Sequence, residues 1–370
     1  MEWGIFLVTA LPPFMTEEET IQNSVAYAVA AENMGFDHAW VLEHHFTRYG
    51  LVGSALMHAS FILGHTTKLK VGTAVQVLPL HHPVQMAEQV ALIDHLSGGR
   101  FIFGVGRGSF LKDFKVFGAD MGKSRESAVE ALEIVRRCWV EGRCQYDGQF
   151  HRFPEVEIYP RPITRPHPQL YTVARSPESL TWAAKEGIPL IFGHNSQSDE
   201  QKAVALEQYG MYAEAAGHDP SKIPHIISCL AGVSRNGDDI KKASWDHLVW
   251  WYEEGTEASG LHAPDSPVVP SYEWRQRERQ ERVLRGMRSA ADTLPDEYAM
   301  NPIGSPQECI DKLNTTVEIT GVTRFILGFE AAGRRADVLR SMQMFKEEVI
   351  PHVSGARAQE RSLAPSESLP

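Results

Sequence analysis

Short apolar runs alternate with segments of helical spacing along most of this chain. Residues 3–9 form the first apolar run, residues 17–34 show helical spacing that Gly35 closes, and residues 39–42 are apolar again. Further strands are predicted over residues 69–75, 101–105, 169–174, 189–192, 225–233 and 324–328. Helices are predicted over residues 17–34, 53–64, 84–96, 124–141, 176–186, 201–216, 238–251 and 336–349. Such repeated pairs of strand and helix are typical of a parallel sheet.

Eight pairs of strand and helix in 370 residues favour a closed barrel over an open sheet. An open sheet that binds a dinucleotide would carry a GxGxxG motif after its first strand, whereas this sequence reads Thr9-Ala10-Leu11-Pro12-Pro13 there. We therefore predict the α/β class, as a (β/α)8 TIM barrel with an insertion between strand 7 and strand 8.

The predicted barrel occupies residues 1–353 as a single domain. Residues 253–300 interrupt the repeat, are rich in proline, serine and charge, and are a candidate lid over the barrel mouth. Residues 354–370 offer little to bury, so we predict a disordered tail there.

Composition argues against several classes of function. A formal net charge of −11 repels phosphate backbones, so we expect no nucleic-acid surface. No apolar run is long enough to cross a membrane, and the acidic N-terminus does not resemble a signal peptide. The four cysteines show neither CxxC spacing nor a paired framework, which argues against zinc sites and structural disulfides and indicates a reduced, cytoplasmic setting.

Polar side chains gather where predicted strands end, which is where TIM barrels place their active sites. Glu43, His44 and His45 follow the second strand, Arg107 follows the fourth inside a glycine-rich turn, and Ser176 opens the helix after the fifth. No His-x-His follows the first strand, so we expect no metal site. A helix start with unpaired N–H groups would, with Arg107, suit a phosphate. Taken singly, Ser176 also fits a plain N-cap and Arg107 a surface ion pair.

Six runs of residues together resemble bacterial luciferase. They are Glu43-His44-His45-Phe46-Thr47-Arg48-Tyr49-Gly50-Leu51, Pro79-Leu80-His81-His82-Pro83, residues 97–108 beginning Ser97-Gly98-Gly99-Arg100-Phe101, Lys112-Asp113-Phe114-Lys115-Val116-Phe117-Gly118, Ile303-Gly304-Ser305-Pro306 and Gly328-Phe329-Glu330-Ala331-Ala332-Gly333. The resemblance runs from Trp3 to Pro351 and looks closest to the luciferase α subunit.

This resemblance implies a two-component, flavin-dependent monooxygenase. A separate flavin reductase would supply reduced FMN, and the enzyme would use it with O2 to hydroxylate or epoxidise an organic substrate, such as a natural-product intermediate. His44 matches the family's active-site histidine, and an imidazole that titrates near neutrality can pass a proton to or from a reacting group. His45 should point the other way at the strand end, as a supporting residue.

The resemblance and the strand ends together assign the other site residues to two groups. The expected cofactor-binding residues are Glu43, Ala74, Val75, Gly106, Arg107, Arg175, Ser176, Ser179 and Phe192. Among them Arg107, Ser176 and Ser179 match the family's phosphate-binding positions, and Ala74-Val75 matches its non-prolyl cis peptide. The expected substrate pocket contains Phe6, Phe46 and Phe110.

Two departures from the family pattern bear on the reaction. Gly106 stands where luciferases often have a reactive cysteine, and Arg175 stands where α subunits have an acid. Both weaken the case for a light-emitting aldehyde monooxygenase, which stays an alternative. A deazaflavin-dependent oxidoreductase and a barrel that binds flavin without catalysis are further alternatives. We also expect a homodimer that pairs through the helix at residues 85–96.

Overall fold

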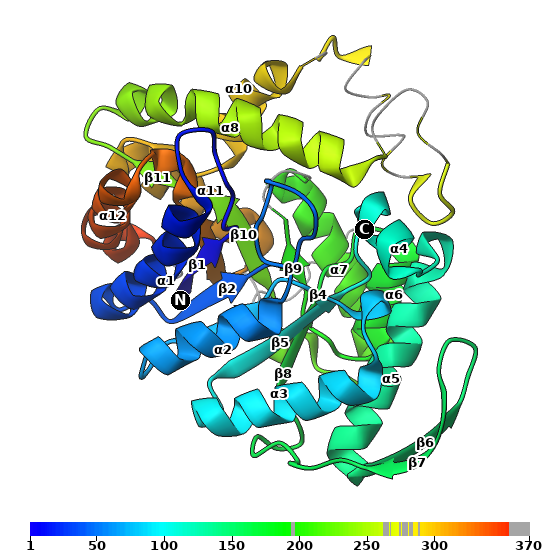
Figure 1. The fold of residues 1–370 in the computed structure, drawn as a ribbon. Coiled ribbons are helices and arrows are strands. Elements are labelled where there is room, and N and C mark those ends of the chain that lie inside the picture. Colours follow the sequence, from blue (N-terminus) through cyan, green and yellow to red (C-terminus); the bar gives the residue numbers. More distant parts are fainter. Residues whose placement is uncertain are drawn as a thin grey trace, which may run out of the picture.

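The computed structural model describes residues 1–193, 197–261, 266, 268–273, 275, 280, 284–287 and 289–354. Eight parallel strands form its barrel: β1 (Glu2–Leu7), β2 (His38–Val41), β3 (Lys70–Thr73), β5 (Phe101–Gly106), β8 (Gln169–Thr172), β9 (Ile191–Phe192), β10 (Ile226–Leu230) and β13 (Arg324–Gly328). The hydrogen-bonded order runs β8-β5-β3-β2-β1-β13-β10-β9. A parallel bridge between Thr172 and Leu190 joins β8 to the segment before β9, which closes the circle. The predicted TIM barrel is therefore confirmed (Figure 1).

A helix follows each barrel strand on the outside. These helices are α1 (Glu17–Met34), α2 (Ala55–His65), α3 (Pro83–Ser97), α5 (Ser124–Glu141), α6 (Pro177–Lys185), α7 (Asp199–Ala215), α8 (Gly237–Ser259) and α12 (Arg335–Met344). Local sequence sets their ends: in α1 a capping box between Thr16 and Glu19 starts the helix, and Gly35 ends it with a φ of 78°. The barrel interior is packed, since a Cβ on Gly72 would lie 2.5 Å from the ring of the fully buried Trp40.

Several elements were not predicted from the sequence. An antiparallel hairpin, β6 (Arg143–Asp147) and β7 (Arg152–Glu157), projects beside α5 (Figure 1). The predicted seventh strand divides into β10 and β11 (Gly232–Val233), and β11 pairs with β12 (Ile303–Gly304). Short β4 (Gln76–Val77) and α4 (Leu111–Phe117) complete the additions. Helix α11 (Pro306–Thr320) precedes β13, where a helix before the eighth strand was expected. The hairpin strands are mostly exposed, so they lack the apolar runs that mark the barrel strands.

The 253–300 segment differs from the prediction at both ends. Helix α8 continues through Ser259, well past residue 251, and α10 (Ala290–Met300) forms the end of the segment. Among the residues between them that the structure describes, Tyr272 is buried in a small second core with Phe114, Met121 and Leu261. The predicted tail begins at Ser354, and the rest of it lies outside the described residues.

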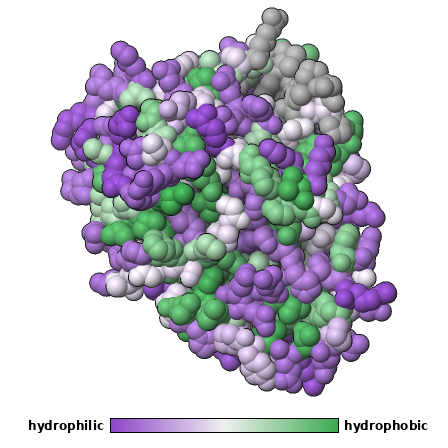
Figure 2. Space-filling model, in the orientation of Figure 1, coloured by the Kyte–Doolittle hydropathy of each residue, from purple (hydrophilic) through white to green (hydrophobic). Residues whose placement is uncertain are grey.

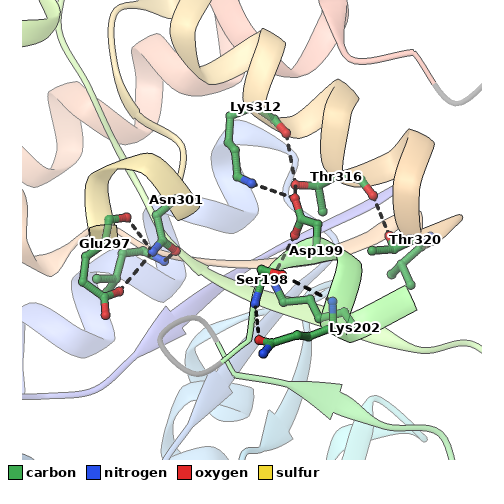
Figure 3. A network of polar contacts seen from close by, with 11 residues as sticks. Ser198, Asp199, Lys202, Glu297, Asn301, Lys312, Thr316 and Thr320 are labelled. Atoms are coloured by element: carbon green, nitrogen blue, oxygen red, sulfur yellow. Dashed lines mark hydrogen bonds and ion pairs between the residues drawn. The ribbon is translucent and has the colours of Figure 1, made fainter. Parts of the chain in front are cut away.

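A network of ion pairs and hydrogen bonds surrounds Asp199, and Asn301 and Glu297 lie beside it (Figure 3). Asp199, at the start of α7, accepts hydrogen bonds from Lys202 at 3.0 Å, Lys312 at 2.6 Å and Thr316 at 2.7 Å. Asn301, just after α10, accepts from the backbone N–H of Leu230 at 2.9 Å. The network therefore ties α7, α11 and the end of the insertion to the barrel. No described helix is long and apolar enough to span a membrane.

Candidate active site

A cavity of about 1020 Å³ opens at the C-terminal ends of the barrel strands. Its walls come from the residues after β2, the residues around β4, the loop after β5, the start of α6, one face of α8, and described parts of the 253–300 segment. Parallel strands all point their carboxyl ends at this rim, so residues far apart in sequence converge there. Among the described residues, no group of three or more His, Cys, Asp or Glu side chains could hold a metal ion.

His44 lies in the wall of this cavity between aromatic rings. Its imidazole stacks on Phe110 with 4.6 Å between ring centroids and meets the ring of Tyr49 edge-on at 4.9 Å. Burial lowers the pKa of His44 to about 4, so the ring is neutral at physiological pH. Its Nε2 atom is inaccessible to solvent and has no hydrogen-bond partner among the described residues. Burial therefore moves this imidazole away from the titration near neutrality that the sequence predicted. The neutral ring still has one nitrogen that no described residue engages and that can exchange a proton with a bound molecule.

Glu43 also lines the cavity, but the protein occupies its carboxylate. Oε2 accepts from the side chain of Gln76 and from the backbone N–H of Val77 at 2.9 Å. Oε1 faces Nε2 of His45 at 3.0 Å and Nε2 of His81 at 2.6 Å. Burial alone would raise the pKa of Glu43, but these hydrogen bonds outweigh it and hold the pKa below its usual value. Glu43 therefore fixes the end of β2 to β4, and His45 supports it.

The cavity floor is formed by Ala74, Val75 and Gly106. The peptide bond between Ala74 and Val75 is cis, as the resemblance implied. A Cβ on Gly106 would lie 2.5 Å from Cγ2 of Val75, so only glycine fits beside this valine. Packing against Val75 therefore requires glycine at position 106.

The predicted phosphate-binding residues converge at the start of α6. Arg107, Arg175 and Ser179 line the cavity, while Ser176 is buried as the N-cap and accepts from the N–H of Ser179 at 3.3 Å. The hydroxyl of Ser176 also donates to that of Ser179 at 3.1 Å. The N-cap interpretation of Ser176 is therefore confirmed, and this cap stands where a helix N-terminus meets guanidinium groups.

The structure adds Arg125, which sequence reasoning missed. Its Nη2 donates to the hydroxyl of Ser176 at 3.2 Å and lies 3.3 Å from the carboxylate of Glu178. Its Nε is buried without a described partner. Arg125 lies in the first turn of α5, which follows no barrel strand directly, so only the packing of α5 against the barrel brings it to this site.

The guanidinium of Arg107 is held by the 253–300 segment. It donates to the hydroxyl of Ser271 at 2.7 Å and to the carbonyl of Ser271 at 2.8 Å. It also lies over the ring of Tyr272, 4.1 Å from the centroid, and the Tyr272 hydroxyl donates to the carbonyl of Gly108 at 2.6 Å. The segment predicted as a lid thus contacts the predicted phosphate site directly.

The predicted aromatic residues divide between the cavity and other places. Phe110 lines the cavity, whereas Phe6, Phe46 and Phe192 do not contribute to its described lining. Phe46 has a φ of 56° and turns outward, half exposed, beside Phe117. Phe6 and Phe192 are buried in the core of the barrel.

Asp113 lines the cavity and was not singled out for chemistry from the sequence. It is only 4% exposed, and its Oδ1 has no described hydrogen-bond partner. Burial raises the pKa of Asp113 to about 6, so this carboxyl titrates close to neutrality.

Comparisons with known proteins match nearly the whole chain. A model of the family "Luciferase-like monooxygenase" matches residues 1–324. The alkanal monooxygenase alpha chain of a Kryptophanaron alfredi symbiont is 37% identical over 353 residues, covering 95% of this chain and 98% of that protein. The corresponding chain of Photorhabdus luminescens is 35% identical, covering 95% of this chain and 96% of its own.

Solved structures share the fold. The crystal structure of monooxygenase RslO1 from Streptomyces bottropensis has a TM-score of 0.78 and 25% identity, and the match covers 96% of this chain and all of that one. The oxygenating constituent of 3,6-diketocamphane monooxygenase from Pseudomonas putida, solved with FMN, has a TM-score of 0.78 at 17% identity, covering 96% of this chain and 99% of its own. The chain therefore belongs to the luciferase-like monooxygenase family of flavin-dependent enzymes.

Proposed function

We propose that this chain is the oxygenating component of a two-component monooxygenase that uses reduced FMN and O2 to hydroxylate or epoxidise an organic substrate. The observation that carries the proposal is a single cavity that joins a cluster of guanidinium groups at a helix start to a neutral, unengaged imidazole. One end of this cavity suits a phosphate, and the other suits a proton-transfer step. The expected separate reductase follows from the resemblance.

The residues present fit FMN. Its phosphate would be held by Arg107, Arg125 and Arg175 with the N–H groups that open α6, where cations and the positive helix end act together. The buried Nε of Arg125, which has no described partner, is a donor that such an anion would satisfy. The ring system would lie against Val75, whose side chain fills the space beside Gly106. Reduced FMN would supply the electrons and the centre at which O2 is activated.

In this proposal His44 is the catalytic residue. Its imidazole is neutral, and the aromatic rings of Phe110 and Tyr49 hold it in one place, so it can accept a proton at Nε2 and return it. Glu43, His45 and His81 do not react with the substrate here. They hold the strand end on which His44 stands.

The cavity walls also bear on the substrate. Helix α8 contributes Glu253, Thr256 and Glu257 to the cavity wall, all of them polar. A saturated aldehyde chain would offer these side chains no hydrogen-bonding group, whereas a ring system with polar substituents could contact both them and Phe110. This supports an aromatic, oxygenated natural-product intermediate over a long-chain alkanal.

Reconstitution with a flavin reductase tests the proposal. Purified protein, reductase, NADH and FMN should oxidise an aromatic test compound such as 2-naphthol in air, with an oxygen atom from ¹⁸O2 appearing in the product. Reduced deazaflavin should not replace FMN, and decanal should give little light. Hydride transfer from reduced deazaflavin without O2 uptake would instead establish the deazaflavin alternative. FMN binding without any oxygenated product would favour the non-catalytic alternative.

We also propose a homodimer through α2 and α3, in a cytoplasmic protein. The two helices pack side by side and carry large exposed apolar side chains: Met57 at 74%, Phe61 at 56%, Leu92 at 48% and Leu96 at 70% exposure. Figure 2 shows apolar patches over this part of the surface. An exposed apolar patch of this kind is typical of an interface. Light scattering should give twice the mass of one chain, and Phe61→Asp with Leu96→Asp should give the mass of one.

A further inference from the structure

Helix α8 contains a glycine where a helix would favour another residue. Gly255 lies within α8, one turn before its end, and glycine weakens a helix interior. A Cβ built on Gly255 would lie 2.7 Å from Cε2 and 2.9 Å from Cδ2 of Tyr49, closer than real Cβ contacts come. The glycine is therefore required by what packs against it.

Tyr49 cannot move aside to admit that Cβ without disturbing the rings around it. Its ring stacks on Trp251, one turn earlier on the same face of α8, with 4.9 Å between centroids and 7° between planes. A further side of the ring faces Phe110 at 5.7 Å. Close-packed aromatic rings have few alternative positions, so a shift of Tyr49 must be passed on to its neighbours.

The neighbour that matters is His44. The Tyr49 ring meets the imidazole in a T-shaped contact with 4.9 Å between centroids, and the imidazole stacks on Phe110 at 4.6 Å. A Cβ on Gly50 would lie 3.0 Å from Cδ2 of His44, so the backbone at Gly50 also packs closely against the imidazole. The charged groups that act on His44 are Glu43 and His45. The position and surroundings of the imidazole thus depend on where α8 places Tyr49.

We propose that Gly255 and Tyr49 are positioning residues for His44: the missing side chain at Gly255 lets α8 press Tyr49 against the imidazole. This inference rests on the proposed role of His44 in catalysis. It assigns to α8, which leads into the 253–300 segment, control over the placement of the proton-transfer group.

Gly255→Ala tests this inference. The pKa of His44 is measured in flavin-free protein by NMR with ¹³C-labelled histidine, and a His44→Asn spectrum assigns its signal. With Tyr49 displaced, water reaches the imidazole, so its pKa should rise by about one unit or more. Turnover should fall about tenfold to a hundredfold, while the FMN dissociation constant should stay within about threefold because the phosphate site is elsewhere.

Gly210 offers a matched control, since it is also inside a helix, α7, and a Cβ there would make only ordinary contact with Pro220 at 3.8 Å. Gly210→Ala should leave turnover and the pKa of His44 unchanged. In a Tyr49→Ala background the ring that clashes with the new Cβ is gone. Adding Gly255→Ala there should change turnover by less than about twofold and the pKa of His44 by less than about 0.3.

Two results would overturn the inference. One is a folded Gly255→Ala protein in which the pKa of His44 and the turnover match wild type. The other is an equal loss from Gly255→Ala with and without Tyr49. If Gly255→Ala does not fold, Tyr49→Ala alone decides, because an unchanged His44 pKa there refutes the positioning role. If wild type fails to bind FMN, the proposed function fails, but the NMR measurement still decides the positioning.

Discussion

Replacing Arg125 with alanine should weaken the binding of FMN and leave that of riboflavin nearly unchanged. Riboflavin has the same ring system but no phosphate. In the structure Arg125 donates to the Ser176 hydroxyl at 3.2 Å, and its buried Nε has no described partner. A phosphate at the start of α6 would accept hydrogen bonds from this guanidinium. Riboflavin has no charged group that could accept these hydrogen bonds, so its affinity should not depend on Arg125.

The size of the effect follows from these contacts. A hydrogen bond to a charged group contributes about 1.5–3 kcal/mol. The Arg125 side chain is 23% exposed, so solvent screens it partly and the lower part of that range applies to each bond. The ion pair with Glu178, whose side chain is 63% exposed, adds little that the mutation could remove. One or two such bonds give about 1.5–3 kcal/mol, or a loss in affinity of about 10- to 150-fold.

Anaerobic fluorescence titration with FMN and with riboflavin measures both affinities. The control is Arg136→Ala on the same helix, because Arg136 pairs at 2.6 Å with Glu186 at the C-terminal end of α6, whereas Arg125 contacts Ser176 at the start of α6. Its FMN affinity should stay within about twofold of wild type. If Arg125→Ala weakens FMN and riboflavin equally, or weakens neither, the phosphate does not lie beside Arg125 and the reasoning is wrong.

Three further predictions concern the catalytic group and the core. His44→Ala should lower turnover by about 10² to 10⁴ and barely change FMN affinity, and an unchanged rate would remove His44 from the mechanism. The folded protein holds the pKa of His44 at about 4, below the unfolded value of 6.5, so acid favours the unfolded state. Urea melts of wild type and His44→Asn should therefore differ in the free energy of unfolding by an amount that is constant above pH 6.5, and wild type should lose about 3 kcal/mol more than His44→Asn between pH 6.5 and pH 4. Asp199→Ala leaves the buried Lys202 unpaired and should cost about 3–5 kcal/mol in the same assay, and a loss below about 1 kcal/mol would contradict the network's role.

Much of the barrel could be predicted because its signals are local. A buried strand between capped helices leaves an apolar run and a capping box within a few residues, as in α1, and eight such units specify a closed sheet. The hairpin β6–β7 escaped this reasoning because its exposed strands carry no apolar run. The end of α8 could not be predicted either, because a glycine such as Gly255 is a local signal for a helix end. In the structure the helix continues past Gly255, and Tyr49 packs against this glycine and against Trp251 of the same helix.

The sequence by itself determined which residues stand at the strand ends, since alternation of strand and helix places His44 and Arg107 at one rim. It could not determine their partners. Ser271 reaches Arg107 from 164 residues away, and Arg125 meets Ser176 from 51 residues away. No pattern in the sequence predicts either contact, because both form only when the barrel closes and α5 and the 253–300 segment pack onto it. The tertiary structure therefore decided the electrostatics of the site, the low pKa of His44 included, since burial among rings is a property of the packed fold.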